Sequence, residues 1–472
     1  MSQPQHPDDG ADLINSGQDS VRDDDAYSLD RQMVARIMEA VEAGDRQRLI
    51  EALEPLHPAD IADVIEQINS AERRRLIELY GTEFDGEVLS ELDDAIREDV
   101  IELLPRDVLV EAVRDLESDD VVDLVEDLEG EQQAAILDAL EAPDRIAVEQ
   151  SLTYPEYSAG RLMQREVVMA PEHWNVGDAI DFMRNQDDLP QQFYHLTLVD
   201  PKLRPVGNVT LGRLMGSRRD IALKTLVEEV FHVIPVTQPE ADVAYAFNQY
   251  HLISAPVVDA EDRLVGVITI DDAMVVLDEE AEEDILRLAG VSEEGSLSDT
   301  VLSTTRRRLP WLAVNLATAV LASLVIAIFE DAIAQLVALA VLMPIVASMG
   351  GNAGTQSLTV AVRAIATRDL TGSNMWRFIT REVTVGLVNG LIFAVVMGVV
   401  GVIWFGGPEL GYVIAAAMVI NLVMAGLAGT VIPVVLERFR VDPALASGTF
   451  VTTVTDVVGF FAFLGLATIY LL

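Results

Sequence analysis

The chain has 472 residues, half of them hydrophobic, and its 32 basic and 77 acidic side chains give a formal charge of −45. Such a negative field argues against nucleic-acid binding, and the absence of cysteine excludes disulfides, iron–sulfur clusters and thiolate zinc sites. Because residues 306–472 hold nine arginines and eight acidic residues, whereas residues 1–305 carry a net charge of −46, the composition predicts an acidic soluble part followed by an apolar membrane part.

The acidic part begins with a polar segment and continues with short helices. Residues 1–27 predict a disordered acidic tail, and no secretory signal opens the chain, so this part is expected to lie in the cytosol. Residues 60–68, 97–104 and 119–128 each place apolar side chains at three-to-four spacing after an acidic start. Repeated short amphipathic helices of this kind predict an all-α superhelical domain over residues 28–155.

A second kind of repeat follows at an offset of 59 residues, where residues 197–215 match residues 256–274. Each copy predicts a strand, a turn, a strand and a helix, with a glycine in the turn and a threonine capping the helix. The aligned identities are Asp200/Asp259, Gly207/Gly266, Thr210/Thr269 and Met215/Met274. The pattern resembles an α/β tandem CBS pair, a regulatory module that often dimerises, with its units over residues 156–222 and 223–276.

Residues 277–306 connect this pair to the membrane part and begin with a dense acidic run at residues 278–284. The segment predicts a helix that continues as far as residue 305. One interpretation is a solvated connecting face. The other is a cation-sensing element, because crowded carboxylates repel one another and bound divalent cations would relieve that repulsion.

The membrane part contains five segments long enough to cross a bilayer, which takes about 20 apolar residues. They are residues 309–329, 333–362, 383–408, 410–436 and 443–472. All nine arginines fall on one side of a five-helix topology over residues 307–472, since three precede the first segment, four lie between the second and third, and two lie between the fourth and fifth. The positive-inside rule therefore predicts a multi-pass protein of the inner cell membrane, with a large cytosolic N-terminal part and the C-terminus outside.

Asp456 is the single charged residue of the last segment. A carboxylate within a membrane helix costs at least about 2.5 kcal/mol and usually faces a polar pathway, although it can also bond to a neighbouring helix. Thr452 lies four residues earlier and shares its helical face. A twofold dimer would bring two Asp456 carboxylates to one axis and offset the charge of a divalent cation.

The second membrane segment carries a further polar patch at residues 350–357, which includes Asn352. Within and just beyond it, Gly351, Thr355 and Thr359 recur every four residues and would form one stripe along a helix. Such residues either let helices pack closely or supply oxygen ligands. Together with Asp456, this patch favours an ion pathway.

Four motifs give the chain a resemblance to the MgtE magnesium channel/transporter family over about residues 29–472. They are residues 56–60 (Leu-His-Pro-Ala-Asp), 158–163 (Ser-Ala-Gly-Arg-Leu-Met), 351–357 (Gly-Asn-Ala-Gly-Thr-Gln-Ser), and 442–444 (Asp-Pro-Ala) followed by 456–459 (Asp-Val-Val-Gly). The resemblance implies a homodimeric Mg²⁺ channel in the lipid bilayer, and not an enzyme. Asp456 matches the family's selectivity aspartate, and Gly351, Thr355 and Thr359 match the stripe that faces it.

The resemblance also implies a gate that cytosolic Mg²⁺ closes by joining the helical domain, the CBS pair and the connecting (plug) helix. ATP at the CBS pair is a further ligand that it implies. The residues at matching sensing positions are Glu87, Asp119, Asp123, Asp272, Glu280, Glu283, Asp284 and Asp442. The sequence departs from the family at Pro239, Ala241 and His251 in the second CBS unit, and at Gly448.

Two alternatives stay open from the residues themselves. A coupled divalent-cation carrier could use Asp456 as a proton or sodium relay. A membrane-anchored CBS sensor would bind a ligand without any transport. Enzymatic activity is not expected, because the sequence has no phosphate-binding glycine loop, no nucleophile elbow and no histidine-rich metal motif.

Overall fold

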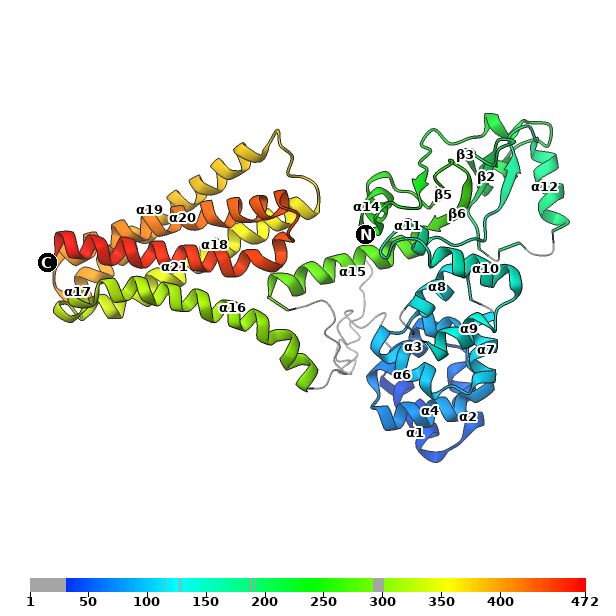
Figure 1. Cartoon of the computed structure of the whole chain (residues 1–472), viewed down its shortest axis with the longest axis horizontal. Helices are drawn as coiled ribbons and strands as arrows, with labels where there is room; N and C mark the ends of the chain where they lie inside the picture. Colours follow the sequence, from blue (N-terminus) through cyan, green and yellow to red (C-terminus); the bar gives the residue numbers. More distant parts are fainter. Residues whose placement is uncertain are drawn as a thin grey trace, which may run out of the picture. The chain divides into compact units, whose positions relative to one another are not determined.

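The computed structural model describes residues 31–114, 116–126, 128, 130–186, 189–190, 192–291 and 301–472. The predicted tail over residues 1–27 lies outside the described residues. The chain divides into two compact units (Figure 1). The first contains residues up to 243 together with 250–270, and the second contains residues 244–249 and 271–472.

The first unit begins with the predicted run of short helices, which is confirmed. Local caps explain several boundaries: the Asp45 carboxylate accepts a hydrogen bond from the Arg48 amide, and Asn69 and Glu72 form a capping box. The helices are α1 (Arg31–Ala43), α2 (Arg46–Leu53), α3 (Pro58–Gln67), α4 (Ser70–Tyr80), the 3₁₀ turn η2 (Gly81–Glu83), α5 (Glu87–Ser90), α6 (Asp94–Leu103), α7 (Arg106–Arg114), α8 (Ser118–Glu126), α9 (Glu131–Leu137) and α10 (Ala142–Ser151).

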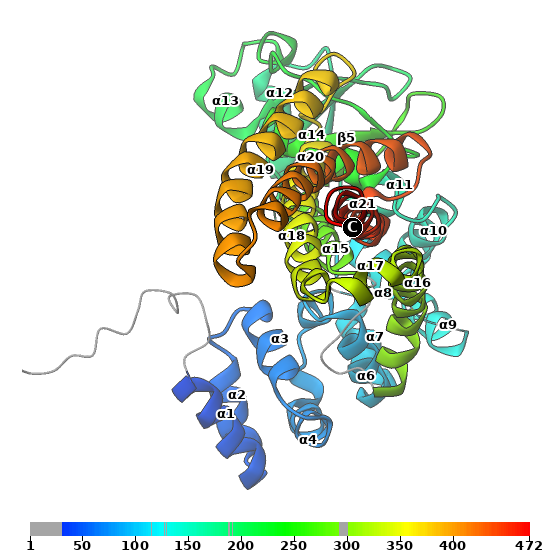
Figure 2. The ribbon, with the colours of Figure 1, turned by 90° about the vertical axis from the view of Figure 1, so that its left-hand side faces the viewer.

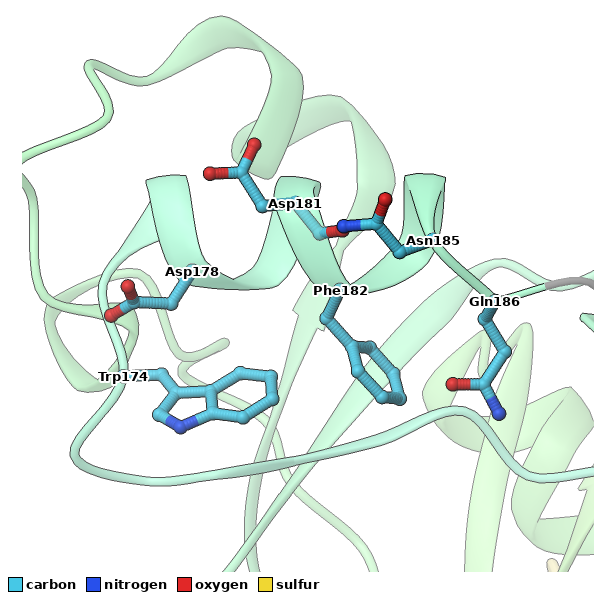
Figure 3. A pocket seen from close by; sticks show the side chains of 6 residues that line it. All are labelled: Trp174, Asp178, Asp181, Phe182, Asn185 and Gln186. Atoms are coloured by element: carbon cyan, nitrogen blue, oxygen red, sulfur yellow. The ribbon is translucent and has the colours of Figure 1, made fainter.

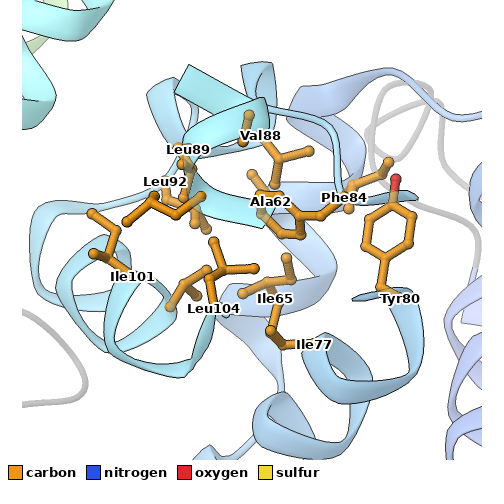
Figure 4. Packing of buried hydrophobic residues seen from close by; sticks show 14 of the residues in the cluster. Ala62, Ile65, Ile77, Tyr80, Phe84, Val88, Leu89, Leu92, Ile101 and Leu104 are labelled. Carbon is orange, nitrogen blue, oxygen red and sulfur yellow. The ribbon is translucent and has the colours of Figure 1, made fainter. Parts of the chain in front are cut away.

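One continuous hydrophobic core joins these helices. Their apolar faces meet around fully buried side chains such as Ile65, Ile77 and Leu89, which point toward one another in Figure 4. Burying such a side chain contributes about 1.5–3 kcal/mol. Because no single helix here exceeds 13 residues, this shared core, and not helix propensity, stabilises the domain.

Each copy of the tandem repeat forms the two predicted strands, and a third strand that the pattern did not predict completes a three-stranded sheet in each copy. β1 (Met169–Pro171) runs parallel to β2 (His195–Val199), which pairs antiparallel with β3 (Pro205–Thr210), and β4 (Ile234–Pro235), β5 (Ser254–Val258) and β6 (Leu264–Thr269) repeat this order. The accompanying helices are α11 (Ala159–Leu162), α12 (Val176–Arg184), α13 (Leu211–Gly216), the 3₁₀ turn η3 (Leu223–Thr225), α14 (Glu240–Tyr250) and α15 (Ile270–Leu288).

The two glycines of the repeat do not form turns, which corrects the expectation. Gly207 and Gly266 lie within β3 and β6. A Cβ atom would approach the Val227 side chain to 2.5 Å at Gly207, and the Gln164 carbonyl oxygen to 2.7 Å at Gly266. Both glycines are therefore required by close packing.

The turns themselves are held by the repeated aspartates. Asp200 accepts hydrogen bonds from the amides of Lys202 and Arg204, and Asp259 accepts the equivalent bonds from Glu261 and Arg263. Such aspartate-to-backbone bonds mimic a turn and fix the hairpin. Thr210 caps α13 as predicted, since its hydroxyl accepts a hydrogen bond from the Arg213 amide.

The second unit contains the five predicted membrane helices, which are confirmed in the described part of the chain. They are α16 (Val301–Ile328), α18 (Ala338–Ala366), α19 (Met375–Phe405), α20 (Pro408–Arg438) and α21 (Pro443–Tyr470), with the short α17 (Glu330–Gln335) between the first two. Figures 1 and 2 both show α18, α20 and α21 side by side.

Glycines let α19 and α20 approach closely. A Cβ atom would lie 2.4 Å from the Leu422 carbonyl oxygen at Gly386, and 2.7 Å from the Glu382 carbonyl oxygen at Gly426. Lipid supplies no hydrophobic drive for helix association, so such small residues favour packing by allowing close contact. In this unit α20 packs against α18, α19 and α21.

The connecting helix is shorter than predicted. The acidic run forms the second half of α15, but α15 ends at Leu288, and residues 292–300 lie outside the described residues. Gly290 adopts a left-handed φ of 72°, and the Val291 amide donates to the Leu286 carbonyl oxygen at 3.0 Å. This is the glycine-dependent end of a helix, so the prediction of a continuous helix to residue 305 was wrong.

Candidate functional site

The predicted stripe on the second membrane helix forms along α18. The hydroxyl of Thr355 donates to the Gly351 carbonyl oxygen and that of Thr359 donates to the Thr355 carbonyl oxygen, each at 3.0 Å. Both threonines are exposed in the single chain. Because each hydroxyl donates to its own helix, its oxygen lone pairs face outward as acceptors.

The stripe lies beside α21, the helix that carries Asp456. A Cβ atom at Gly351 would lie 3.9 Å from the methyl group of Thr452. Thr452 donates in turn to the carbonyl oxygens of Gly448 and Thr449, each at 3.0 Å. The structure thus brings together the two polar patches that the sequence places about 100 residues apart.

Asp456 is half-buried on α21. Within the described residues, its carboxylate makes no hydrogen bond and no ion pair. The alternative in which Asp456 bonds to a neighbouring helix of the same chain therefore has no support among the described residues. Asn352, the other predicted pathway residue, is exposed and donates to Ser348 Oγ at 3.4 Å.

Two buried polar residues of the membrane helices were missed by sequence reasoning. Glu382 lies on α19, is 7% exposed, and accepts a hydrogen bond from Ser357 Oγ at 3.1 Å. Asn421 lies on α20 and is fully buried. Their signal in the sequence is a polar residue inside an otherwise apolar helix, but α19 starts earlier than the charge-free segment that predicted it.

A second candidate site lies where α15 meets the start of α21. We call it the α15 cluster, and it consists of Glu280, Glu283, Asp284, Arg287 and Asp442. Arg287 pairs with Asp442 at 2.6 Å and also with Glu283. Asp442 additionally caps α21 by accepting a hydrogen bond from the Ala444 amide at 2.7 Å. One guanidinium therefore bridges two of the carboxylates that were predicted to sense cations.

The surroundings of Asp284 disfavour the ionised form of its carboxyl group. Burial, together with the nearby charges of Asp442 and Glu280, raises the pKa of this carboxyl to about 6. A group shifted in this way would gain from a bound cation, because a cation favours the ionised form. Carboxylate oxygens are also the donors that Mg²⁺ prefers.

The remaining predicted sensing residues lie elsewhere. Glu87 begins α5 and Asp119 lies in the first turn of α8, and these two helices pack together. Asp123 pairs with Arg97 at 2.7 Å, and Asp272 lies in the first turn of α15. Within the described ranges, no three histidine or acidic side chains are grouped closely enough to hold a metal ion, so the ligand sets stay predictions.

The CBS pair also carries a surface hollow of about 470 Å³ beside α12 (Figure 3). Trp174 and Phe182 form its apolar floor, and the carboxylates of Asp178 and Asp181 lie at its edge. The lining includes no basic side chain. It therefore lacks the positive charge of a typical phosphate site, and it contains none of the predicted site residues.

Three protein-family models match the chain, one of them twice. The MgtE intracellular N domain matches residues 56–157, the CBS domain matches residues 159–220 and 223–279, and the divalent cation transporter of the MgtE type matches residues 343–466. Their order is the one that the sequence predicts.

Full-length relatives match over almost the whole chain. The magnesium transporter MgtE of Thermus thermophilus is 32% identical over 462 residues, which cover 94% of this chain and 99% of the relative. That of Bacillus subtilis (strain 168) is 28% identical over 440 residues, covering 93% and 98%. A crystal structure of the cytosolic domain of the Mg²⁺ channel MgtE in complex with ATP aligns with 52% of this chain and 99% of its own, at 27% identity and a TM-score of 0.48.

Proposed function

This chain belongs to the MgtE family of magnesium transporters, and we propose that it is a Mg²⁺-selective channel closed by cytosolic Mg²⁺. It is a multi-pass membrane protein with a large soluble N-terminal part, and it transports magnesium. The proposal adds the pathway, the orientation in the inner membrane with the soluble part in the cytosol, and the gate.

The pathway is proposed to pass Asp456. The observation that carries this is a carboxylate with no partner among the described residues, beside the stripe of Gly351, Thr355 and Thr359. One Asp456 offsets only half the charge of Mg²⁺. A symmetric dimer would present two of these carboxylates to the same ion. Since Mg²⁺ gives up water reluctantly, the hydroxyl and carbonyl oxygens would receive it with part of its hydration shell.

The gate is proposed to act through the α15 cluster together with Glu87, Asp119, Asp123 and Asp272. Support comes from the pairing of α15 with the start of α21 through Arg287 and Asp442, and from the raised pKa of Asp284. Cations that bind these carboxylates would hold the soluble elements against the membrane helices. Loss of the cations would release them.

ATP is proposed as a second ligand of the CBS pair, on the strength of the family resemblance. The described structure holds the two CBS units together at equivalent positions, since His195 Nδ1 and Ser254 Oγ lie 2.6 Å apart. Equilibrium binding of labelled ATP to the purified chain tests this ligand. Binding that survives saturating unlabelled ATP would be non-specific and would count against it.

The test of the channel is Mg²⁺ flux into proteoliposomes for the wild type, Asp456→Ala, and the matched control Glu409→Gln, which changes an exposed acid at the start of α20. We expect wild-type flux to fall when internal Mg²⁺ is high, Asp456→Ala to lose flux or selectivity, and Glu409→Gln to behave as wild type. Unchanged flux in Asp456→Ala would remove the proposed pathway. Flux that depends on an imposed proton or sodium gradient would replace the channel by a coupled carrier.

A further inference from the structure

Asn421 is a buried polar side chain near the proposed pathway. It is fully buried on α20, and its Nδ2 donates to the Val346 carbonyl oxygen of α18 at 2.8 Å. Its Oδ1 has no hydrogen-bond partner in the described structure. A buried acceptor without a partner is costly in a membrane protein, where no bulk water can compensate it. An apolar residue of the same size would avoid this cost.

Two glycines form the slot that holds the Asn421 carboxamide. A Cβ atom would lie 2.2 Å from Asn421 Nδ2 at Gly350 of α18, and 2.8 Å from it at Gly459 of α21. Neither position can accept a larger residue unless the carboxamide moves. The Asn421 side chain of α20 is therefore enclosed between the backbones of α18 and α21.

The slot lies at the level of the proposed pathway residues. Gly350 directly precedes Gly351, and Gly459 follows Asp456 by three residues, slightly less than one helical turn. The hydrogen bond to Val346 fixes α18 along its axis relative to α20, while contact with Gly459 fixes the distance to α21. Any displacement at Asn421 would change the separation of the Gly351 stripe from the Asp456 carboxylate.

We propose that Asn421 is a positioning residue for ion selection, which sets the spacing of α18 and α21 at the level of Gly351 and Asp456. The proposal rests on the channel function proposed above. It explains why a polar side chain is retained despite its unsatisfied acceptor, since an apolar side chain could fill the slot but could not fix the axial register of α18. Selectivity depends on the spacing of oxygen ligands, because Mg²⁺ requires a tighter geometry than Ca²⁺.

The test compares Asn421→Leu with Thr430→Val in the reconstituted full-length protein. Thr430 is an apt control, because it is also fully buried on α20, but within the described residues its hydroxyl bonds only to its own helix, at the Gly426 and Leu427 carbonyl oxygens. The measurements are the fluxes of Mg²⁺ and of Ca²⁺, and the melting temperature in detergent. We expect Asn421→Leu to lower the Mg²⁺/Ca²⁺ flux ratio by about three- to tenfold, the range that one interhelical hydrogen bond supports.

Thr430→Val should keep the wild-type ratio even if its melting temperature falls as far as that of Asn421→Leu. An unchanged ratio in Asn421→Leu, or an equal loss in Thr430→Val, would overturn the positioning role alone. If Asn421→Leu does not assemble, Asn421→Ser takes its place with the same expected and contrary results. If the wild type showed no more Mg²⁺ flux than Asp456→Ala, both the channel function and the positioning role would be overturned.

Discussion

Arg287 occupies a place where a divalent cation is expected to act. Its guanidinium pairs with Asp442 of α21 and with Glu283 of its own helix, and both carboxylates are only about one quarter exposed or less. A cation that binds these carboxylates must therefore compete with a positive charge already attached to the chain. Such competition would set the Mg²⁺ concentration at which the gate closes.

The variant Arg287→Gln tests this competition. Without the guanidinium, the acids of the α15 cluster repel one another more strongly at low Mg²⁺ and attract Mg²⁺ more strongly when it is present. We expect the internal Mg²⁺ concentration for half-maximal closure to fall by about fivefold or more, as measured by flux against internal Mg²⁺. Arg438→Gln, an exposed charge at the end of α20, is the control, and an equal shift in that variant would contradict the competition.

At the scale of single elements, the end of α15 is specified by Gly290. This glycine has a left-handed φ of 72°, and a Cβ atom there would also lie 2.4 Å from the Trp311 side chain of α16. The end of the acidic helix is thereby fitted to the first membrane helix. An ion bound at the α15 cluster would therefore be linked to α16 through the close approach of Gly290 to Trp311.

Gly290→Ala should disturb this segment without touching any acidic residue. A left-handed alanine costs about 1–2 kcal/mol, and the clash with Trp311 adds to that cost. We expect faster amide hydrogen exchange at the end of α15 and weaker closure at high Mg²⁺, with flux at low Mg²⁺ retained. Gly372→Ala is the control, since its Cβ meets nothing within 4 Å. Normal closure in Gly290→Ala would show that this helix end does not transmit the signal.

The elements also show how far sequence reasoning reaches. The 59-residue offset found both CBS units and the hydropathy found all five membrane helices, because periodicity and length are local signals. The Asn421 slot could not be found this way, since its hydrogen bond joins residues 75 positions apart. Gly207 and Gly266 were assigned to turns because glycine marks both turns and close contacts, and only the packing distinguishes the two. Gly290 indicates the end of α15, because glycine commonly follows the last residue of a helix, whereas the acidic run before it favours a longer helix.

At the scale of the whole molecule, the charge distribution is the dominant feature. Residues 1–305 carry a net charge of −46, whereas the membrane part is close to neutral. Self-repulsion on this scale destabilises compact structure and is screened by salt, with a Debye length of about 10 Å at 0.1 M. The soluble part should therefore respond to any cation, and the response to Mg²⁺ must be separated from general screening.

Thermal unfolding of the full chain in detergent makes that separation. NaCl should raise the first unfolding temperature gradually, whereas Mg²⁺ at matched ionic strength should raise it by several degrees more, because a ligand bound only by the folded state stabilises it. The triple variant Glu280→Gln, Glu283→Gln, Asp284→Asn should keep the NaCl response and lose much of the additional Mg²⁺ response. If the two salts raised the unfolding temperature of the wild type equally, the response of the acidic surface would be general screening and not Mg²⁺ binding.

Five membrane helices, as found in the described part of the chain, are an odd number. The membrane domain therefore enters on one side of the bilayer and ends on the other. An odd set cannot divide into two equal inverted halves, as many carriers do, so any symmetry about the ion must come from a second chain. It also follows that two copies cannot simply be fused end to end. A single-chain dimer, useful for placing one altered Asp456 opposite an intact one, would need an additional membrane span as its linker.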